Sequence, residues 1–160
     1  MINEGSINES DVLIDGERIA KISPSITVDN NVCEIDAQGR FLIPGMIDDQ
    51  DHFREPGLTH KADLATESAA AVAGGITSFM EMPNVDPQTT NKQALRNKYG
   101  LAKDRCRANY SFYMGATNTN IEDIKSIEID DACGIKAFLG ASTGDLLVDD
   151  PKALELLFEH

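Results

Sequence analysis

The chain has 160 residues, of which 41% are hydrophobic and 26% are charged, and these fractions are typical of a soluble globular protein with a sizeable core. Its 27 acidic and 14 basic residues give a net charge of −13, which argues against a nucleic-acid partner or an anionic membrane surface because phosphate groups would be repelled. Three widely spaced cysteines, no visible export signal and no apolar stretch long enough to span a membrane favour a reduced, cytoplasmic protein.

Residues 1–43 have the pattern of short strands, and no helix is expected there. Two apolar runs within residues 11–22 flank Asp15-Gly16, which predicts a hairpin. Residues 32–43 predict another strand, a turn at Gln38-Gly39 and a strand that leads into the next part of the chain. We therefore expect residues 1–43 to form part of a small β domain, and its abrupt beginning suggests that a piece of its first strand is missing.

From residue 44 onward, strand-like and helix-like stretches alternate, which is typical of βα units around a parallel sheet. The expected strands are residues 46–53, 76–82, 108–114 and 134–139, and the expected helices are residues 60–73, 90–103, 121–127 and 151–158, with caps at Thr59, at Thr89 or Thr90, and at Asp150. Four βα units make half of an eight-stranded barrel, and a complete barrel usually needs more than ~200 residues. Because the sequence stops within its fourth helix, we expect residues 44–160 to be the first half of a (β/α)8 barrel in an N-terminal fragment. A complete open sheet of four strands is the alternative.

Polar side chains crowd the first expected strand of this second part. Asp48, Gln50, His52 and Arg54 would share one face, because side chains of a strand alternate with a period of two. This face would be either the floor of a site or the solvated face of an edge strand. Reactive groups of a βα barrel lie at the C-terminal ends of its strands. The sequence places these groups there: Gln50, His52, Arg54, the run Glu81-Met82-Pro83-Asn84, and Lys136.

Two of these groups suit a metal site. The imidazole of His52 suits a transition metal such as zinc, although a single histidine is more often not a ligand. Lys136 lies within an apolar strand, so either its stem extends to the surface or burial lowers the pKa of its amine, which then reacts as a nucleophile or with carbon dioxide. A carbamate on that amine would be negatively charged and could bridge two metal ions.

The sequence supports neither a serine-hydrolase triad nor a nucleotide-binding site. Residues 140–144 match G-x-S-x-G, the nucleophile elbow of serine hydrolases. We reject Ser142 as a nucleophile because no helix follows it directly and His160 is the only later histidine. The sequence contains neither a P-loop nor a G-x-G-x-x-G motif, so nucleotide binding has no support.

Three segments are similar to the signatures of a known family. Residues 44–57, Pro-Gly-Met-Ile-Asp-Asp-Gln-Asp-His-Phe-Arg-Glu-Pro-Gly, resemble the first-strand signature of dihydroorotases, in the cyclic amidohydrolase branch of the amidohydrolase superfamily. Residues 71–84 resemble the second-strand segment of that family, and residues 134–140 resemble the segment with the carboxylated lysine in many cyclic amidohydrolases. The resemblance runs over nearly the whole chain and implies an α/β fold, an amidohydrolase barrel preceded by a small β-sandwich.

The resemblance implies a role for four residues. His52 and a carboxylated Lys136 would bind zinc, two ions in the complete enzyme. Arg54 and Asn84 would bind the substrate carboxylate, a task that suits the forked guanidinium group. The implied reaction interconverts N-carbamoyl-aspartate and dihydroorotate in pyrimidine biosynthesis, by attack of a metal-bridging hydroxide on an amide carbonyl. No catalytic acid or base is expected within this chain, because the family's later histidine ligands and aspartate are absent from it.

The sequence departs from the family pattern in one segment. The pattern His-x-His reads Gln50-Asp51-His52 here, and an amide oxygen is a weak zinc ligand. The middle position is usually apolar because it faces the helix layer, so Asp51 would be a buried charge with a desolvation cost of several kcal/mol.

These observations predict a zinc-dependent dihydroorotase-like hydrolase with a small-molecule substrate, inactive as this chain alone. The sequence is compatible with a homo-oligomer and does not predict its size. The first alternative is a hydantoinase or an allantoinase, against which the run Arg54-Glu-Pro-Gly argues. The second is a metal-deficient, non-catalytic homologue that acts as an assembly partner, and Gln50 supports this alternative.

Overall fold

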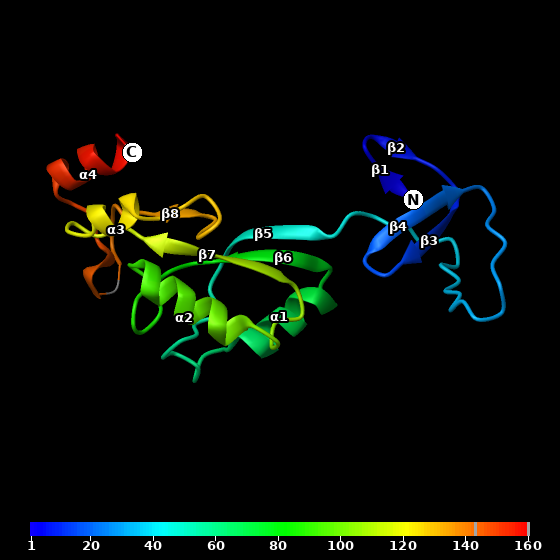
Figure 1. The fold of residues 1–160 in the computed structure, drawn as a ribbon, viewed down its shortest axis with the longest axis horizontal. Coiled ribbons are helices and arrows are strands. Elements are labelled where there is room, and N and C mark those ends of the chain that lie inside the picture. The colour runs from blue at the N-terminus through cyan, green and yellow to red at the C-terminus, as the bar shows by residue number, and fades with distance from the viewer. Residues whose placement is uncertain (143, 160) are drawn as a thin grey trace. The chain divides into compact units, whose positions relative to one another are not determined.

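The computed structural model describes residues 1–142 and 144–159 (Figure 1). The chain divides into two compact units, Met1–Pro44 and Gly45–His160, and each is described by itself. None of the helices in the described part of the chain is long and apolar enough to cross a membrane.

The first unit contains two small antiparallel sheets. Strands β1 (Ile2–Asn3) and β2 (Ser6–Ile7) form one sheet, and β3 (Asp11–Asp15) and β4 (Arg18–Ser23) form the expected hairpin. Asp15 pairs with Arg18, so the loop consists of Gly16 and Glu17, one residue later than the predicted turn. Gly16 has a φ of 58°, which glycine adopts at no steric cost.

The strands expected within residues 32–43 are absent, and that prediction is wrong. This segment makes one backbone hydrogen bond to a strand of the unit, from the N–H of Ile2 to the carbonyl of Leu42 at 2.8 Å, among the described residues. Its apolar side chains find no cover, since Ile35 is 86% exposed and Phe41 is 69% exposed. An alternating pattern predicts a strand only where a neighbouring strand can accept its hydrogen bonds.

The second unit is built on a parallel four-stranded sheet, as predicted. Its strands are β5 (Met46–Asp51), β6 (Ile76–Glu81), β7 (Asn109–Gly115) and β8 (Gly134–Lys136). They lie in the order β5-β6-β7-β8, with every neighbouring pair parallel. This order, each strand beside its predecessor in the sequence, is that of consecutive βα units of a barrel.

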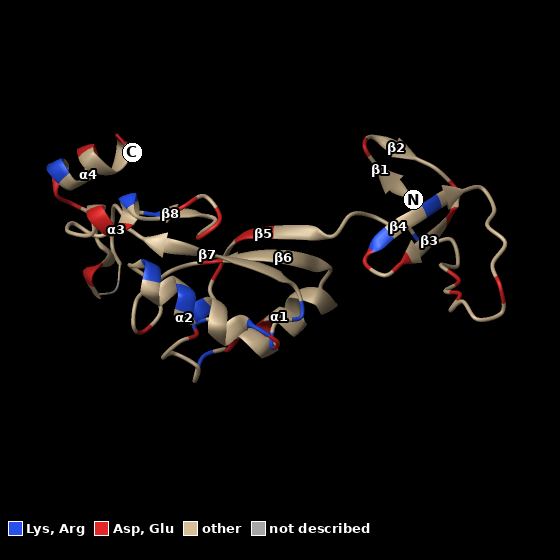
Figure 2. Ribbon diagram, viewed as in Figure 1, with Lys and Arg blue, Asp and Glu red and all other residues tan. Residues whose placement is uncertain are grey.

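Four helices connect or follow these strands: α1 (Leu64–Ala73), α2 (Lys92–Ala102), α3 (Ile121–Lys125) and α4 (Pro151–Phe158). The first two begin later than predicted, because Asp63 and Asn91, rather than threonines, accept the first free backbone N–H groups. Asp150 caps α4 as expected, by accepting the N–H of Lys152. Lysine and arginine positions recur along α2 (Figure 2).

The core of the second unit lies between the sheet and helices α1 and α2, which cover one face of it (Figure 1). Its fully buried members are Leu64, Phe79, Leu95, Ala102, Phe112 and Met114. Helix α2 packs against β7 and α1, and its Lys98 contacts Glu81 at the end of β6. The ends of β5 and β6 carry most of the predicted site residues.

Candidate functional site

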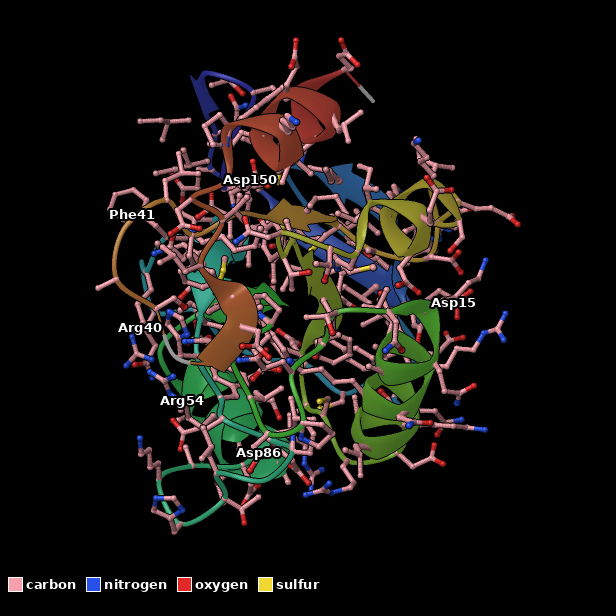
Figure 3. The ribbon with its side chains drawn as sticks, turned by 90° about the vertical axis from the view of Figure 1, so that its left-hand side faces the viewer. Asp15, Arg40, Phe41, Arg54, Asp86 and Asp150 are labelled. Atoms are coloured by element: carbon pink, nitrogen blue, oxygen red, sulfur yellow. The ribbon has the colours of Figure 1, made fainter. Side chains whose placement is uncertain are left out.

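The predicted site residues come from strand ends at one edge of the parallel sheet. His52 and Arg54 directly follow β5, Asn84 lies three residues beyond the end of β6, and Lys136 is the last residue of β8. Parallel strands present their carboxyl ends at the same edge. Figure 3 labels Arg54 and Asp86 on the loops that follow β5 and β6.

His52 and Asn84 form the central contact of the site. The ring Nδ1 of His52 lies 2.8 Å from Oδ1 of Asn84. Because a carbonyl oxygen only accepts, Nδ1 carries the proton and Nε2 keeps a lone pair. Burial lowers the pKa of His52, Asn84 opposes this, and the charges of Arg54 and Lys136 lower it further. The imidazole is therefore neutral at pH 7 with one nitrogen free to bind a metal, the state that a ligand histidine needs.

Arg54 is a half-buried cation in the loop after β5. Its guanidinium forms no ion pair with any residue that the structure describes. Its φ of 69° lies in the left-handed region, which is uncommon for a residue with a side chain. An unpaired guanidinium in a held conformation is suited to bind an anion.

Lys136 is half-buried rather than enclosed, which differs from the expectation of an amine surrounded by apolar side chains. It pairs with Gly115 in the sheet, and its Nζ lies 5.1 Å from the centroid of the Phe138 ring. Its neighbour Ile135 is 37% exposed. Its positive charge is one of the causes that lower the pKa of His52.

A family model described as Dihydro-orotase-like matches residues 39–141. The chain belongs to the dihydroorotase-like family. A dihydroorotase from Methanosarcina acetivorans is 34% identical over 158 residues, which cover 96% of this chain and 33% of the relative. One from Carboxydothermus hydrogenoformans is 50% identical over 91 residues, or 57% of this chain and 21% of the relative.

Solved hydantoinase structures share the fold. The L-hydantoinase (dihydropyrimidinase) from Arthrobacter aurescens superposes with a TM-score of 0.76 at 31% identity, over 94% of this chain and 34% of that one. The D-hydantoinase from Bacillus sp. AR9 gives 0.71 at 28% identity, over 94% and 33%. The predicted family and half-barrel fold are thus confirmed. The relatives that align with nearly the whole of this chain are about three times as long, so the chain spans about a third of their length.

The residues of this dihydroorotase-like chain fit part of a zinc site. The free Nε2 of His52 fits a metal ligand, and Lys136 would fit as a carbamate. A zinc site takes three or four protein ligands, and no group of three or more histidine, cysteine, aspartate or glutamate side chains is placed to hold an ion within the described residues. Gln50 is exposed, and Asp51 is buried on the opposite face, as expected from its position.

Two ion pairs next to the site residues were not predicted from the sequence. Lys98 and Glu81 are buried together, with 2.9 Å between Nζ and Oε2, and Arg105 binds Glu55. The sequence pattern indicates Glu81 only as one of several polar groups at a strand end. The available signal was Lys98 itself, which shares a helix face with Leu95 and Ala102 and so occupies a core-facing position.

Gly57 ends the run Arg54-Glu-Pro-Gly and is required by two features. Its φ is 78°, and a Cβ there would overlap the backbone oxygen of Asp86. The two loops are also joined by a hydrogen bond from the N–H of Asp86 to the carbonyl of Pro56 at 3.1 Å. The glycine therefore lets the loop after β5 approach the loop after β6.

We expect Gly57→Ala to lower the free energy of unfolding of the chain by about 1–3 kcal/mol, since it adds both backbone strain and a steric overlap. Urea unfolding followed by circular dichroism measures this. Gly100→Ala is the matched control, because Gly100 lies within α2 with open space around its Cβ position, and there alanine should stabilise the helix. Equal stability of Gly57→Ala and the parent chain would contradict the expectation.

Proposed function

We propose that this chain contributes the parts of a dihydroorotase active site that come from the first, second and fourth strands of the barrel, and that the complete site interconverts N-carbamoyl-aspartate and dihydroorotate. The observation that carries the proposal is the His52–Asn84 hydrogen bond together with Arg54, whose charge lowers the pKa of His52 and whose guanidinium has no ion-pair partner among residues 1–142 and 144–159. The neutral imidazole of His52 has one nitrogen available for a metal, and the guanidinium of Arg54 is available to bind a carboxylate. The membership of the dihydroorotase-like family supports the same reaction.

In this proposal each residue has one task. Arg54 forms a forked ion pair with the substrate carboxylate, and the side-chain NH2 of Asn84, whose Oδ1 is occupied by His52, donates to the same group. His52 through Nε2 and Lys136 as a carbamate would hold zinc. Zinc, when bound, supplies a Lewis acid and an activated water for opening a cyclic amide. The remaining ligands and the acid–base group would come from the two-thirds of the relatives' length that this chain does not match.

The substrate class follows from this arrangement. A small acidic molecule is attracted to Arg54 and Lys136, although the chain as a whole is acidic. The small-molecule substrate, the role in pyrimidine biosynthesis and the cytoplasmic location are parts of the same proposal.

A chimera tests the function. The chain would replace the matching third of the Methanosarcina acetivorans dihydroorotase, and ring opening of dihydroorotate would be measured together with zinc content and turnover of hydantoin. We expect dihydroorotate turnover with bound zinc. A folded chimera that hydrolyses only hydantoin would support a hydantoinase instead.

One observation favours a second candidate. Gln50 stands where the family pattern has a histidine, and an amide oxygen is a weak ligand for zinc. A folded chimera without zinc and without turnover on either substrate, which gains both after Gln50→His, would identify a metal-deficient, non-catalytic homologue.

The chain alone should not turn over dihydroorotate, because it contains two of the ligands that the proposal requires and no acid–base group. The assay uses purified chain from a host strain that lacks its own dihydroorotase, with the chimera as positive control. Measurable turnover by the chain would show that the proposed division of the active site is wrong.

We expect Arg54→Lys in the chimera to raise KM for dihydroorotate about 10- to 150-fold. Lysine keeps the charge but loses the forked geometry, and a hydrogen bond to a charged group contributes about 1.5–3 kcal/mol. Arg96→Lys is the matched control, since Arg96 is exposed on α2. An unchanged KM and kcat would show that Arg54 does not contact the substrate.

A further inference from the structure

Lys98 is a buried cation on α2 that contacts the end of β6, one of the two strand ends that carry the site. Its side chain is 1% exposed, and its ammonium lies 2.9 Å from Oε2 of Glu81 and donates to the carbonyl of Met82 at 3.0 Å. The ammonium also lies 5.0 Å from the centroid of the Phe112 ring. Burying an ammonium costs several kcal/mol, and a well-packed apolar pair is often as stable as a buried ion pair. A gain in folding stability is therefore not a sufficient reason for the buried Lys98–Glu81 pair.

The Met82 carbonyl belongs to the segment that carries Asn84. The hydrogen bond from Lys98 fixes the backbone at the end of β6, two residues before Asn84. The N–H of Met82 in turn donates to the carbonyl of Asp51 at 3.1 Å, immediately before His52. A single ammonium thus anchors the point at which the two strand ends are joined.

Glu81 extends this anchor to the loop after β5. Its fully buried carboxylate faces the backbone N–H groups of Phe53 and Arg54. These groups and Lys98 oppose the rise in the pKa of Glu81 that burial causes. None of the contacts to Glu81 has full hydrogen-bond geometry among the described residues, so the carboxylate attracts this loop mainly through its charge.

Arg105 holds the other side of the same loop. Its guanidinium contacts both oxygens of Glu55, with Nη1–Oε1 at 2.8 Å and Nη2–Oε2 at 3.2 Å. The second Glu55 oxygen also accepts the N–H of Leu64, at 3.0 Å. Glu55 is 8% exposed. Arg54 therefore lies between a backbone segment that faces Glu81 and a glutamate that is clamped by Arg105.

We infer that Lys98 and Arg105 are positioning residues, which hold the loop after β5 and the end of β6 so that His52, Arg54 and Asn84 meet. Lys98 acts through Glu81 and the Met82 carbonyl, and Arg105 acts through Glu55. The link to substrate binding rests on the proposed function, whereas the link to the geometry of His52 does not. The same contacts explain the left-handed backbone conformation of Arg54. The residue before it, Phe53, is attracted by Glu81, and the residue after it, Glu55, is bound by Arg105.

The first test uses the 160-residue chain and the double variant Glu81→Leu/Lys98→Met. This variant removes both charges of the pair together, so neither position 81 nor position 98 is left with an unpaired buried charge, and the chain should fold. Nitrogen-15 NMR of the His52 ring and hydrogen exchange of the Phe53 and Arg54 amides are the readouts. We expect the His52 signals to shift toward an average of the two tautomers and both amides to exchange at least 10-fold faster. Lys92→Met is the matched control, because Lys92 lies on the same helix and pairs with Asp131 at 2.6 Å, away from the site.

A folded double variant with the parent tautomer and the parent exchange rates would overturn the inference for Lys98. Arg105→Gln and Arg105→Lys provide a separate test that does not disturb the core, since the Arg105 side chain is 39% exposed. We expect at least 10-fold faster exchange of the Leu64 amide in Arg105→Gln and a partial return in Arg105→Lys, which keeps one ion pair but not the fork. Parent-like exchange of Leu64 in Arg105→Gln would overturn the inference for Arg105.

The chimera separates positioning from a merely structural role. If Lys98 acts through Arg54, the double variant Glu81→Leu/Lys98→Met should raise KM at least 10-fold with a smaller change in kcat, and adding Arg54→Lys should cause little further loss. Effects on KM that simply multiply in the combined variant would overturn the link to Arg54. An inactive parent chimera would contradict the proposed function alone, because the NMR and exchange measurements do not need turnover.

Discussion

Lys136→Ala is expected to abolish measurable dihydroorotate turnover in the chimera. The methyl group can neither form a carbamate nor bind a metal. Loss of a partner that only supports a metal ligand typically costs 10- to 100-fold in affinity or activity, so loss of a ligand itself should cost more than about 100-fold. Steady-state assays at saturating zinc measure the effect, and zinc content shows whether metal is lost together with turnover.

The specificity of this effect can be checked in two ways. Short carboxylic acids added to Lys136→Ala should restore part of the activity by taking the place of the carbamate. Lys152→Ala is the matched control, since Lys152 is an exposed lysine of α4 that is not part of the site. An active, zinc-loaded parent chimera whose Lys136 is an unmodified amine, by carbon-13 NMR with labelled bicarbonate or by crystallography, would exclude the bridging role.

Asp51→Val is expected to stabilise the chain at pH 8 by about 5 kcal/mol and to remove part of its pH dependence. Asp51 is 8% exposed, and neither of its carboxylate oxygens has a hydrogen-bond partner in the described part of the chain. Burial, followed by the charges of Glu81 and Asp48, raises the pKa of Asp51 from 3.8 to about 8, and Lys98 opposes this. Valine suits a β-strand and removes the need to bury a carboxyl group.

The sign of the pH dependence follows from the direction of this pKa shift. Between pH 4 and pH 8 the folded chain keeps a proton on Asp51 that the unfolded chain releases, so Asp51 lowers the stability by about 1.4 kcal/mol for each pH unit in that window. Above pH 8 both states are ionised and the penalty is constant. The difference in unfolding free energy between Asp51→Val and the parent should therefore grow from pH 4 to pH 8 and then level off.

Chemical unfolding of both chains at several pH values measures this difference. Asp49→Val is the matched control, because Asp49 is an exposed residue of the same strand, and it should show no comparable growth. A constant difference between Asp51→Val and the parent across the window would show that the Asp51 carboxyl titrates normally in the folded chain.

Local patterns in the sequence were enough to predict the βα alternation and the family, and they also led to a prediction of the site residues. The second part of the chain alternates apolar strands with alanine-rich and capped helical segments, and each of these patterns is local, so it can be read without a fold. The run at residues 44–57 and the run at residues 71–84 carry short motifs whose residue types are specific to one chemistry. For this reason His52, Arg54 and Asn84 could be predicted as site residues before their positions were known, and residues 134–140 gave the same prediction for Lys136.

The first residues of the helices and the strands of the first unit could not be predicted from local sequence patterns alone. Threonine and aspartate are both good caps, and Asp63 rather than Thr59 caps α1 because its carboxylate reaches two N–H groups while Leu64 packs into the core. Residues 32–43 have a strand pattern but pair only at Leu42 within the described chain. A strand is defined by its neighbour, which a local pattern does not contain.

The contacts that hold the site depend on the folded topology. Lys98 is 46 residues from His52 in sequence, and nothing local connects them, yet Lys98 contacts Glu81, whose strand partner is Asp51, the residue before His52. The same packing gives His52 its tautomer, through a residue 32 positions away. Charge pairs across a core arise from the folded topology, because their energy depends on burial and distance, and neither quantity exists until the sheet and the helix are packed together.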